Sequence, residues 1–186
     1  MIRIFNAAIL ALLLLPSLAS AQPAQWTTSS GGNGHWYQVV TTPTTISWND
    51  ASAAASAMMQ DGLPGYLVTI TSPQENDWIL SHLTMGDVWT GAIQSPGAVE
   101  PLGGWGWITD EPWTFSNWCS GEPANTGGNE DRLTITYSWP RCPGGWNDAS
   151  QNNVCSGFLV EWSAEVVGTE HRSWGAVKAT YGVAGR

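Results

Sequence analysis

Two segments of the chain, residues 121–131 and 146–148, gather the side chains that best bind a hard cation. They combine acids and amides with glycines and a proline, and almost no basic residue lies near them. Cations such as Ca²⁺ take about six to eight oxygen ligands from carboxylates, amides and backbone carbonyls. Acids clustered without a basic partner are unfavourable unless a cation neutralises them. The pattern therefore predicts a cation site built on loops. The carboxylates and side-chain amides of these two segments would supply the oxygen ligands.

The N-terminal residues are typical of a secretory signal peptide. Arg3 supplies a positive start, residues 7–15 form a short apolar run, and small residues end at Ala21. Such a run is too short to span a bilayer, and no later stretch is long enough to do so. We expect cleavage after Ala21 and a secreted, periplasmic or extracellular protein without a membrane span. An uncleaved anchor is the alternative.

The overall charge restricts the classes of partner. The formal net charge is −9, from six basic and fifteen acidic residues. Binding to nucleic acid or to an anionic membrane surface needs a basic face. We therefore predict no nucleic-acid partner and no anionic membrane partner.

The three cysteines allow one disulfide and leave one thiol over. Export favours a disulfide. Cys142 and Cys155 flank residues 146–148, so a bridge between them would close a short loop around the candidate site. This pairing is the favoured prediction, and a bridge between Cys119 and Cys142 is the main alternative.

Local patterns predict two helices, each with a capping signal. Ser47 and Asp50 begin a helix through residues 51–59. Ser72 and Glu75 form a fuller capping box, with proline at the first helical position. Both predicted helices lie in the first half of the chain.

Strands are predicted where short β-rich runs lie between turn residues. These runs are residues 35–40, 66–71, 88–93, 133–137 and 157–162. The long segment 94–128 has no sustained period, and its many tryptophans favour an ordered, packed loop. Helices gathered early, followed by strands around long loops, predict an α+β fold with a mainly antiparallel sheet.

Composition divides the chain into four parts. After the signal peptide, residues 1–21, the polar and glycine-rich residues 22–34 predict a flexible leader. Residues 35–162 form the predicted folded domain. Residues 163–186 form a C-terminal tail, whose apolar residues near its end recur at the spacing of a short helix.

From about residue 35 to residue 162 the chain resembles the C-type lectin-like domain in its bacterial secreted form. The matching motifs are, in order, residues 65–76, 89–92, 107–110, 116–118, 122–124, 130–131, 146–148 and 158–161. Trp48-Asn49-Asp50 repeats the tripeptide of residues 146–148 at a helix start, so only order and spacing make the second copy informative. The resemblance implies two helices against a mainly antiparallel sheet, with a long ordered loop region.

The same resemblance implies one Ca²⁺, with two vicinal sugar hydroxyls completing its shell. The implied metal ligands are Glu122, Glu130, Asn147 and Asp148. Ala124 stands where sugar-binding members carry an asparagine that contacts both metal and sugar. Asn125, one residue on, is the candidate that could compensate as a ligand-binding residue. The resemblance also implies that the Glu122–Pro123 peptide is cis when metal is bound.

Two further departures limit what carries over from the family. Arg132 stands where a cysteine would follow Glu130 and Asp131, so the cysteine framework is particular to this chain. Gln94 occupies the place of an acid that holds an auxiliary Ca²⁺ in some members, so no second calcium site is predicted.

Three functions remain open at this stage. The first is a secreted, Ca²⁺-dependent carbohydrate-binding module whose partner is a glycan or glycoprotein. Trp139 could stack on a sugar face there, although loop packing is its more common role. The second is a module of the same fold that binds a protein surface without sugar, with or without metal. The third, a glycosidase using Glu122 and Glu130, is disfavoured because both lie in the cation segment. We therefore predict no enzyme activity.

Overall fold

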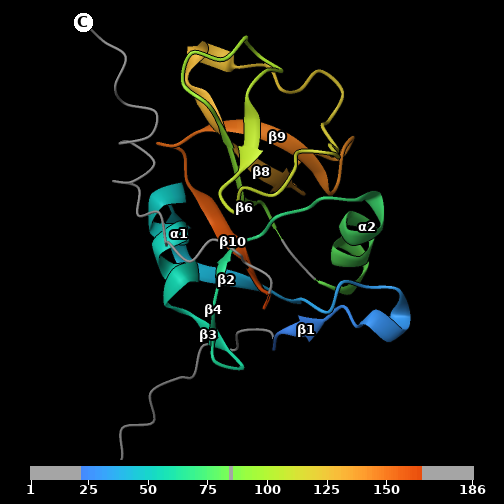
Figure 1. Cartoon of the computed structure of the whole chain (residues 1–186). Coiled ribbons are helices and arrows are strands. Elements are labelled where there is room, and N and C mark those ends of the chain that lie inside the picture. The colour runs from blue at the N-terminus through green and yellow to red at the C-terminus, as the bar shows by residue number, and fades with distance from the viewer. Residues whose placement is uncertain (1–21, 84–85, 165–186) are drawn as a thin grey trace, which may run out of the picture.

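A computed structural model describes residues 22–83 and 86–164 of the chain (Figure 1). The predicted signal peptide and the predicted tail helix lie outside these residues. The helices are α1 (Trp48–Ala57), α2 (Pro73–His82) and the short 3₁₀ turns η1 (Thr28–Ser30) and η2 (Thr126–Gly128). The strands are β1 (Ala24–Gln25), β2 (Trp36–Ile46), β3 (Met59–Gln60), β4 (Leu63–Pro64), β5 (Tyr66–Leu67), β6 (Val88–Gln94), β7 (Trp105–Trp107), β8 (Glu130–Thr136), β9 (Gly145–Ser150) and β10 (Cys155–Trp162). None of the described helices is both long and apolar enough to cross a membrane.

The strands form one large sheet with the order β1-β2-β10-β6-β8-β9. Its pairings are antiparallel except for the parallel pair of β10 with β6. Strands β5 and β7 add to β10 and β6, and β3 and β4 form a separate small hairpin. This is the α+β architecture that the sequence predicts.

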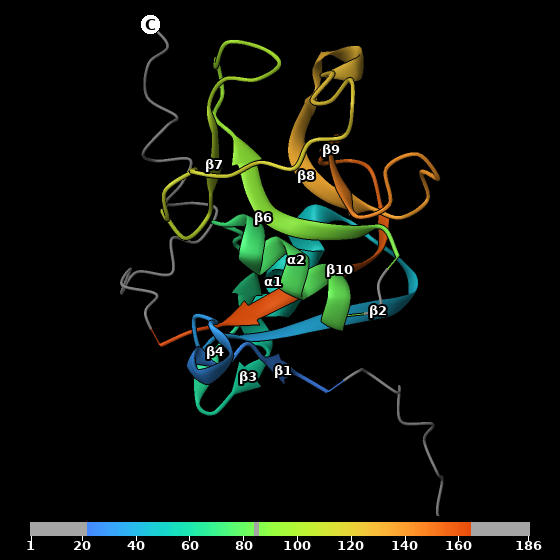
Figure 2. The ribbon, with the colours of Figure 1, turned by 90° about the vertical axis from the view of Figure 1, so that its right-hand side faces the viewer.

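The two helices pack on opposite faces of the sheet, with α1 and α2 on either side of β10 and β2 (Figures 1 and 2). The alternation along β10 explains this, because Phe158 and Val160 pack with α1 while Leu159 packs with α2. Both predicted caps form. The backbone N–H of Asp50 donates to Ser47 Oγ at 3.2 Å, and that of Glu75 donates to Ser72 Oγ at the same distance.

The segment predicted as a flexible leader, residues 22–34, is instead part of the fold. Strand β1 pairs with β2 at Ala24 opposite Tyr37. Trp26 is 8% exposed, and its ring stacks on that of Trp78 in α2 at 6.1 Å. The glycine-rich, polar composition predicted flexibility, but the buried ring of Trp26 packs against Trp78 and so holds the segment in the fold.

The second half of the candidate site lies on a strand, where the sequence predicted a loop. Strand β9 contains Asn147 and Asp148 and pairs antiparallel with β8. Its residues have little intrinsic preference for a strand, so pattern reasoning missed it. Pairing with β8 and complete burial of Trp146 supply the missing stabilisation.

The long segment after β6 is ordered around a cluster of tryptophans, as predicted. Trp113 and Trp118 are partly buried and pack around the fully buried ring of Trp146, with ring centroids 5.7 and 5.9 Å from it. Trp105 and Trp107 of β7 belong to the same cluster. These rings join an otherwise irregular segment to the core that also contains Ile79 of α2 and Leu133 of β8.

The disulfide joins Cys119 to Cys142, so the favoured pairing of Cys142 with Cys155 is wrong. Trp118 forms an isolated β-bridge with Trp146. The next residue, Cys119, donates its backbone N–H to the carbonyl of Trp146 at 2.9 Å. Cys155 begins β10 and is buried as a free thiol in the core cluster under α1. Sequence proximity suggested the wrong partner, because Cys155 is buried in the cluster under α1 whereas the partly buried Cys142 meets Cys119.

Replacing Cys119 and Cys142 together with alanine is expected to lower the free energy of unfolding by about 3 kcal/mol, because the disulfide closes a chain loop of 23 residues. Chemical denaturation without reductant measures this loss. Cys155→Ala is the matched control and should leave the peptide that links Cys119 to Cys142 intact in non-reducing mass mapping. A Cys142–Cys155 peptide in the wild-type protein would contradict the assignment.

Candidate functional site

The candidate residues come from three parts of the fold. Glu122 precedes Pro123, and the peptide between them is cis, the isomer that the family resemblance implies for the metal-bound protein. Asn125 immediately precedes η2 and has a left-handed backbone conformation. The remaining residues lie on paired strands: Glu130 begins β8, while Asn147 and Asp148 lie in the middle of β9.

Asp148 holds the loop segment against the sheet. Its side chain is 1% exposed. Its two carboxylate oxygens accept hydrogen bonds from the backbone N–H groups of Ala124 at 3.0 Å and Asn125 at 2.7 Å. The segment after Pro123 is therefore positioned by a carboxylate that is itself a candidate ligand.

Glu130 and Asn125 close the intervening loop on itself. The N–H of Thr126 donates to Glu130 Oε2 at 2.5 Å, and the N–H of Glu130 donates to Asn125 Oδ1 at 3.1 Å. Asn125 thus uses its amide oxygen to fasten the loop. This contact gives Asn125 a positioning role, whereas the sequence considered it as a substitute for the asparagine missing at position 124.

Asn147 is half-buried beside this loop. Its side-chain nitrogen donates to the backbone carbonyl of Asp148 at 2.6 Å. The amide oxygen of Asn147 is its remaining acceptor. The structure links these candidates in pairs: Asp148 with the backbone of Asn125, Asn125 with the backbone of Glu130, and Asn147 with the backbone of Asp148.

The carboxylates of the site repel one another. Burial, followed by the hydrogen bond and charge of Asp148 and the charge of Glu130, raises the pKa of Glu122 to about 7. Burial and the charge of Asp148 also raise the pKa of Glu130. Neither of the two ion pairs between described residues involves these carboxylates. The raised pKa values of Glu122 and Glu130 fit a site for Ca²⁺, because a cation would relieve the repulsion between the carboxylates.

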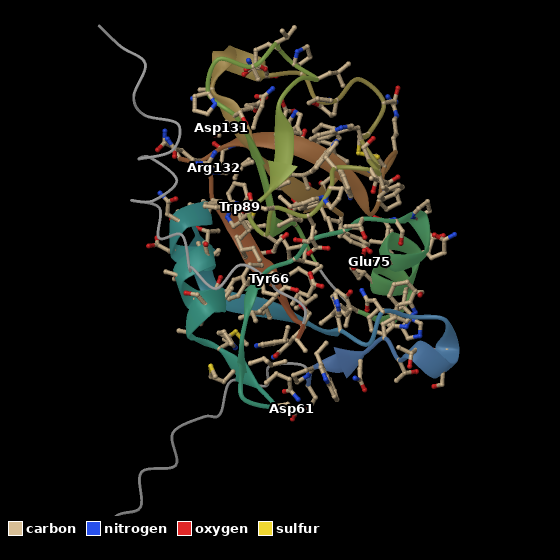
Figure 3. The ribbon with its side chains drawn as sticks, viewed as in Figure 1. Asp61, Tyr66, Glu75, Trp89, Asp131 and Arg132 are labelled. Atoms are coloured by element: carbon tan, nitrogen blue, oxygen red, sulfur yellow. A yellow bond between two sulfur atoms is a disulfide. The ribbon has the colours of Figure 1, made fainter. Side chains whose placement is uncertain are left out.

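Arg132 ties the site strand to helix α1, a contact that the sequence did not predict. Its guanidinium lies 4.7 Å from the ring centre of Trp48 and pairs with Asp131 at 3.1 Å. Figure 3 shows the labelled Asp131 and Arg132 on the same side of the molecule as α1. The only sequence signal was a basic residue at a position where the family carries a cysteine.

A groove of about 180 Å³ lies between the 94–100 loop and the candidate site. Glu100, Asn125 and Glu130 contribute to its lining. At its base, the amide nitrogen of Gln94 donates to Glu100 Oε2 at 3.0 Å and to the carbonyl of Gly103 at 2.9 Å. Gln94 therefore holds the long loop by hydrogen bonds.

Trp139 lies away from this groove. It is 40% exposed in the turn that joins β8 to β9, whereas Glu130 begins β8 at the other end of the hairpin. The loop packing considered for Trp139 from the sequence is therefore incomplete. Its position also separates it from a ligand bound at Glu130.

Comparisons with known proteins agree with this fold. Residues 44–156 match the family model described as lectin C-type domain. A perlucin-like protein of Mytilus galloprovincialis is 30% identical over 118 residues, covering 60% of this chain and 67% of the relative. The low affinity immunoglobulin epsilon Fc receptor of Mus musculus is 35% identical over 107 residues, covering 58% of this chain. The aligned region spans only 28% of that receptor's length.

Solved structures show the same fold at lower identity. The C-type lectin CEL-I from Cucumaria echinata superposes with a TM-score of 0.57 at 20% identity, covering 70% of this chain and 91% of its own. A calcium-independent type II antifreeze protein superposes with a TM-score of 0.56 at 21% identity, covering 77% and 95%. Likeness at this identity establishes the fold alone.

Proposed function

Because the chain belongs to the C-type lectin domain family, we propose that it is a secreted module that binds a glycan or glycoprotein through one weakly held Ca²⁺. Members of this family are binding modules and not enzymes, which agrees with the prediction from the sequence. The observation that supports the proposal is the electrostatic link among three carboxylates, because burial, then the hydrogen bond and charge of Asp148 and the charge of Glu130, raise the pKa of Glu122 to about 7.

The candidate residues would have different roles in binding the cation and the sugar. Glu122, Glu130, Asp148 and the amide oxygen of Asn147 would hold the cation, which supplies open coordination positions for two sugar hydroxyls. A carboxylate oxygen that uses one lone pair for the metal or a backbone N–H can use the other to accept a hydrogen bond from the same sugar hydroxyls. The two backbone hydrogen bonds that Asp148 accepts would hold the 122–130 loop in place while a sugar binds.

Ala124 sets the expected strength of binding. It lacks a side-chain oxygen, so the metal loses one of the family's ligands, and fewer ligands weaken a calcium site. We expect a dissociation constant in the range of about 10⁻⁴ to 10⁻³ M, as in extracellular modules. Titration calorimetry without heat up to about ten millimolar Ca²⁺ would contradict calcium binding.

A glycan array probed with and without chelator tests the proposal as a whole. Binding that disappears with chelator supports it, as does competition by free monosaccharide. The cow CD23 domain, which shares the fold, was solved in the presence of a GlcNAc2Man3 oligosaccharide, so mannose-containing glycans belong on the array. Glycan binding unchanged by chelator would contradict the metal-dependent mechanism.

A second candidate function is a metal-independent protein-binding or adhesion module. Ala124 favours it, and a calcium-independent antifreeze protein shares the fold. This candidate predicts an array without signal and calorimetry without calcium heat. Both results would have to be obtained with protein shown to be folded by its near-ultraviolet circular dichroism.

Calcium affinity is expected to fall about tenfold for each pH unit below 7, because Ca²⁺ must displace the proton that Glu122 binds there. A raised pKa keeps the carboxyl protonated up to about pH 7, so metal binding near neutral pH releases a proton. Calorimetry in two buffers of different ionisation enthalpy measures this release. Identical heats in both buffers at pH 6.5 would contradict it.

A further inference from the structure

A second cluster of ionisable side chains is buried at some distance from the calcium site. It contains His35, which precedes β2, Glu75 of α2 and Glu161 of β10. His35 is 14% exposed, and the two glutamates are 2% and 1% exposed. In Figure 3, Glu75 lies near α2 in the lower half of the molecule, whereas Asp131 lies near the top. The binding function proposed above uses none of these residues.

The two glutamates of the cluster are hydrogen-bonded by neighbouring side chains and backbone N–H groups. His35 Nδ1 lies 2.6 Å from Glu161 Oε1, and the N–H of Thr69 donates to Glu161 Oε2 at 2.9 Å. The hydroxyl of Tyr37 donates to Glu75 Oε1 at 2.7 Å, and the N–H of Thr71 donates to Glu75 Oε2 at 2.8 Å. Each carboxylate oxygen thus faces an N–H or O–H group, an arrangement suited to holding protons more than a metal ion.

The protonation state of the cluster decides how much negative charge is buried there. If His35 is neutral, two negative carboxylates share a site from which water is almost excluded, which is unfavourable. One extra proton, on His35 or Glu161, removes half of that negative charge. The other titratable groups that face the cluster are Tyr37 of β2, Tyr66 of β5 and Glu111. They bring no positive charge that could replace the proton.

The cluster connects the N-terminal segment to the rest of the domain. Asn33 donates to the hydroxyl of Tyr37 at 2.7 Å and to Glu75 at 3.2 Å. The backbone of His35 accepts from the N–H of Trp26 at 3.0 Å. Residues 24–35 are therefore held by the pairing of β1 with β2, by the stacking of Trp26 on Trp78 and by this polar cluster.

We propose that His35, Glu75 and Glu161 form a proton-dependent clasp, which fastens residues 24–35 to α2 and β10 while it holds one extra proton and loosens when that proton leaves. The clasp makes attachment of the N-terminal segment sensitive to pH in the range just below and above neutrality. Its operation does not depend on what the calcium site binds.

The direction of the pH effect follows from the two pKa shifts. Burial raises the pKa of Glu161 to about 7, against the opposing hydrogen bond from His35. Burial alone would lower the pKa of His35, but its contact with Glu161 outweighs this and raises the pKa. Groups that bind protons more tightly when folded stabilise the fold at low pH and lose that effect as the pH rises through the folded value. Stability should therefore fall between about pH 5 and pH 8.

The test compares the melting temperatures of wild type and Glu161→Gln in EDTA from pH 5.5 to 8.5. The glutamine keeps an acceptor for Thr69 and a donor for His35, but it cannot ionise. We expect the wild type to lose about 5 °C more than the variant over this range. Asp77→Asn, which alters an exposed carboxylate on α2, is the matched control and should follow the wild type. Parallel profiles for wild type and Glu161→Gln would overturn the proposal.

Hydrogen exchange locates the effect. After correction for intrinsic rates, the amides of residues 24–37 should lose about tenfold protection between pH 6 and pH 8.5 in the wild type, equal to about 1.4 kcal/mol of local opening. The same amides in Glu161→Gln should keep their protection. Equal loss of protection throughout the sheet in the wild type would overturn a local clasp.

Zinc provides the discriminating control for a metal site. If the cluster were a metal centre, Zn²⁺ at pH 8 would raise the melting temperature of the wild type but not that of His35→Gln. That result would overturn the proton clasp in favour of a metal. No difference between the two proteins in their response to Zn²⁺ supports the clasp.

Discussion

Asp148→Asn is expected to weaken Ca²⁺ binding by at least about a hundredfold, equal to about 2.7 kcal/mol. Asp148 contributes a full negative charge to the site, and its two oxygens accept the hydrogen bonds that place the backbone of Ala124 and Asn125. Asparagine removes the charge and replaces one acceptor with a donor, so one of those N–H groups loses its partner. The metal therefore loses a charged ligand, and the loop carrying Glu122 loses one of the two hydrogen bonds that anchor it.

Thermal denaturation with and without calcium measures this loss without requiring a sugar. If calcium binds the wild type with a dissociation constant near 10⁻³ M, about ten millimolar Ca²⁺ adds about 1.4 kcal/mol to its stability. The variant should show no such gain. Asp77→Asn, on the exposed face of α2, is the matched control and should retain the gain. An equal calcium response in wild type and Asp148→Asn would show that Asp148 is not a ligand.

The same substitution also has a consequence in the absence of metal. Glu122 has its raised pKa partly because of the charge and hydrogen bond of Asp148. Removing that charge should return the pKa of Glu122 toward its usual range. The proton that Glu122 holds at neutral pH is therefore a property of the pair and not of Glu122 alone.

Much of the fold could be predicted because its signals are local. The serine caps at Ser47 and Ser72 fix where both helices begin, and alternation of apolar residues fixes the faces of β10. Strand β9 could not be predicted in this way, because its stabilisation comes from pairing with β8. The ordered N-terminal segment was missed for a similar reason, since Trp26 is buried by Trp78, which lies far along the chain.

The candidate site was predictable as a set of residues but not as an arrangement. The types and order of Glu122, Glu130, Asn147 and Asp148 identify the ligand chemistry. The contact between Asn125 and Glu130 is decided by the left-handed turn at Asn125, which no spacing rule reports. The disulfide was mispredicted because Cys142 lies close in the chain to Cys155 but close in space to Cys119.

Ala124→Asn is expected to strengthen Ca²⁺ binding by about tenfold, equal to about 1.4 kcal/mol. The side chain at position 124 is exposed, and its backbone is already fixed by the hydrogen bond from its N–H to Asp148. An asparagine here can therefore add an amide oxygen to the ligand set without moving the loop. The Oδ1 of Asn125 already accepts the N–H of Glu130, so it has one lone pair left for a metal.

Calorimetry on Ala124→Asn and on Ala124→Leu separates coordination from size, because leucine resembles asparagine in shape but carries no oxygen. Only the asparagine variant should gain calcium affinity, and retention on a mannose or galactose resin should become stronger and remain sensitive to chelator. A gain in calcium affinity without sugar retention would favour the protein-binding alternative. Unchanged calcium affinity in a folded Ala124→Asn variant would mean that position 124 does not face the cation. Glu122, two residues before it, would then also be misplaced as a ligand, because the same short segment carries both side chains.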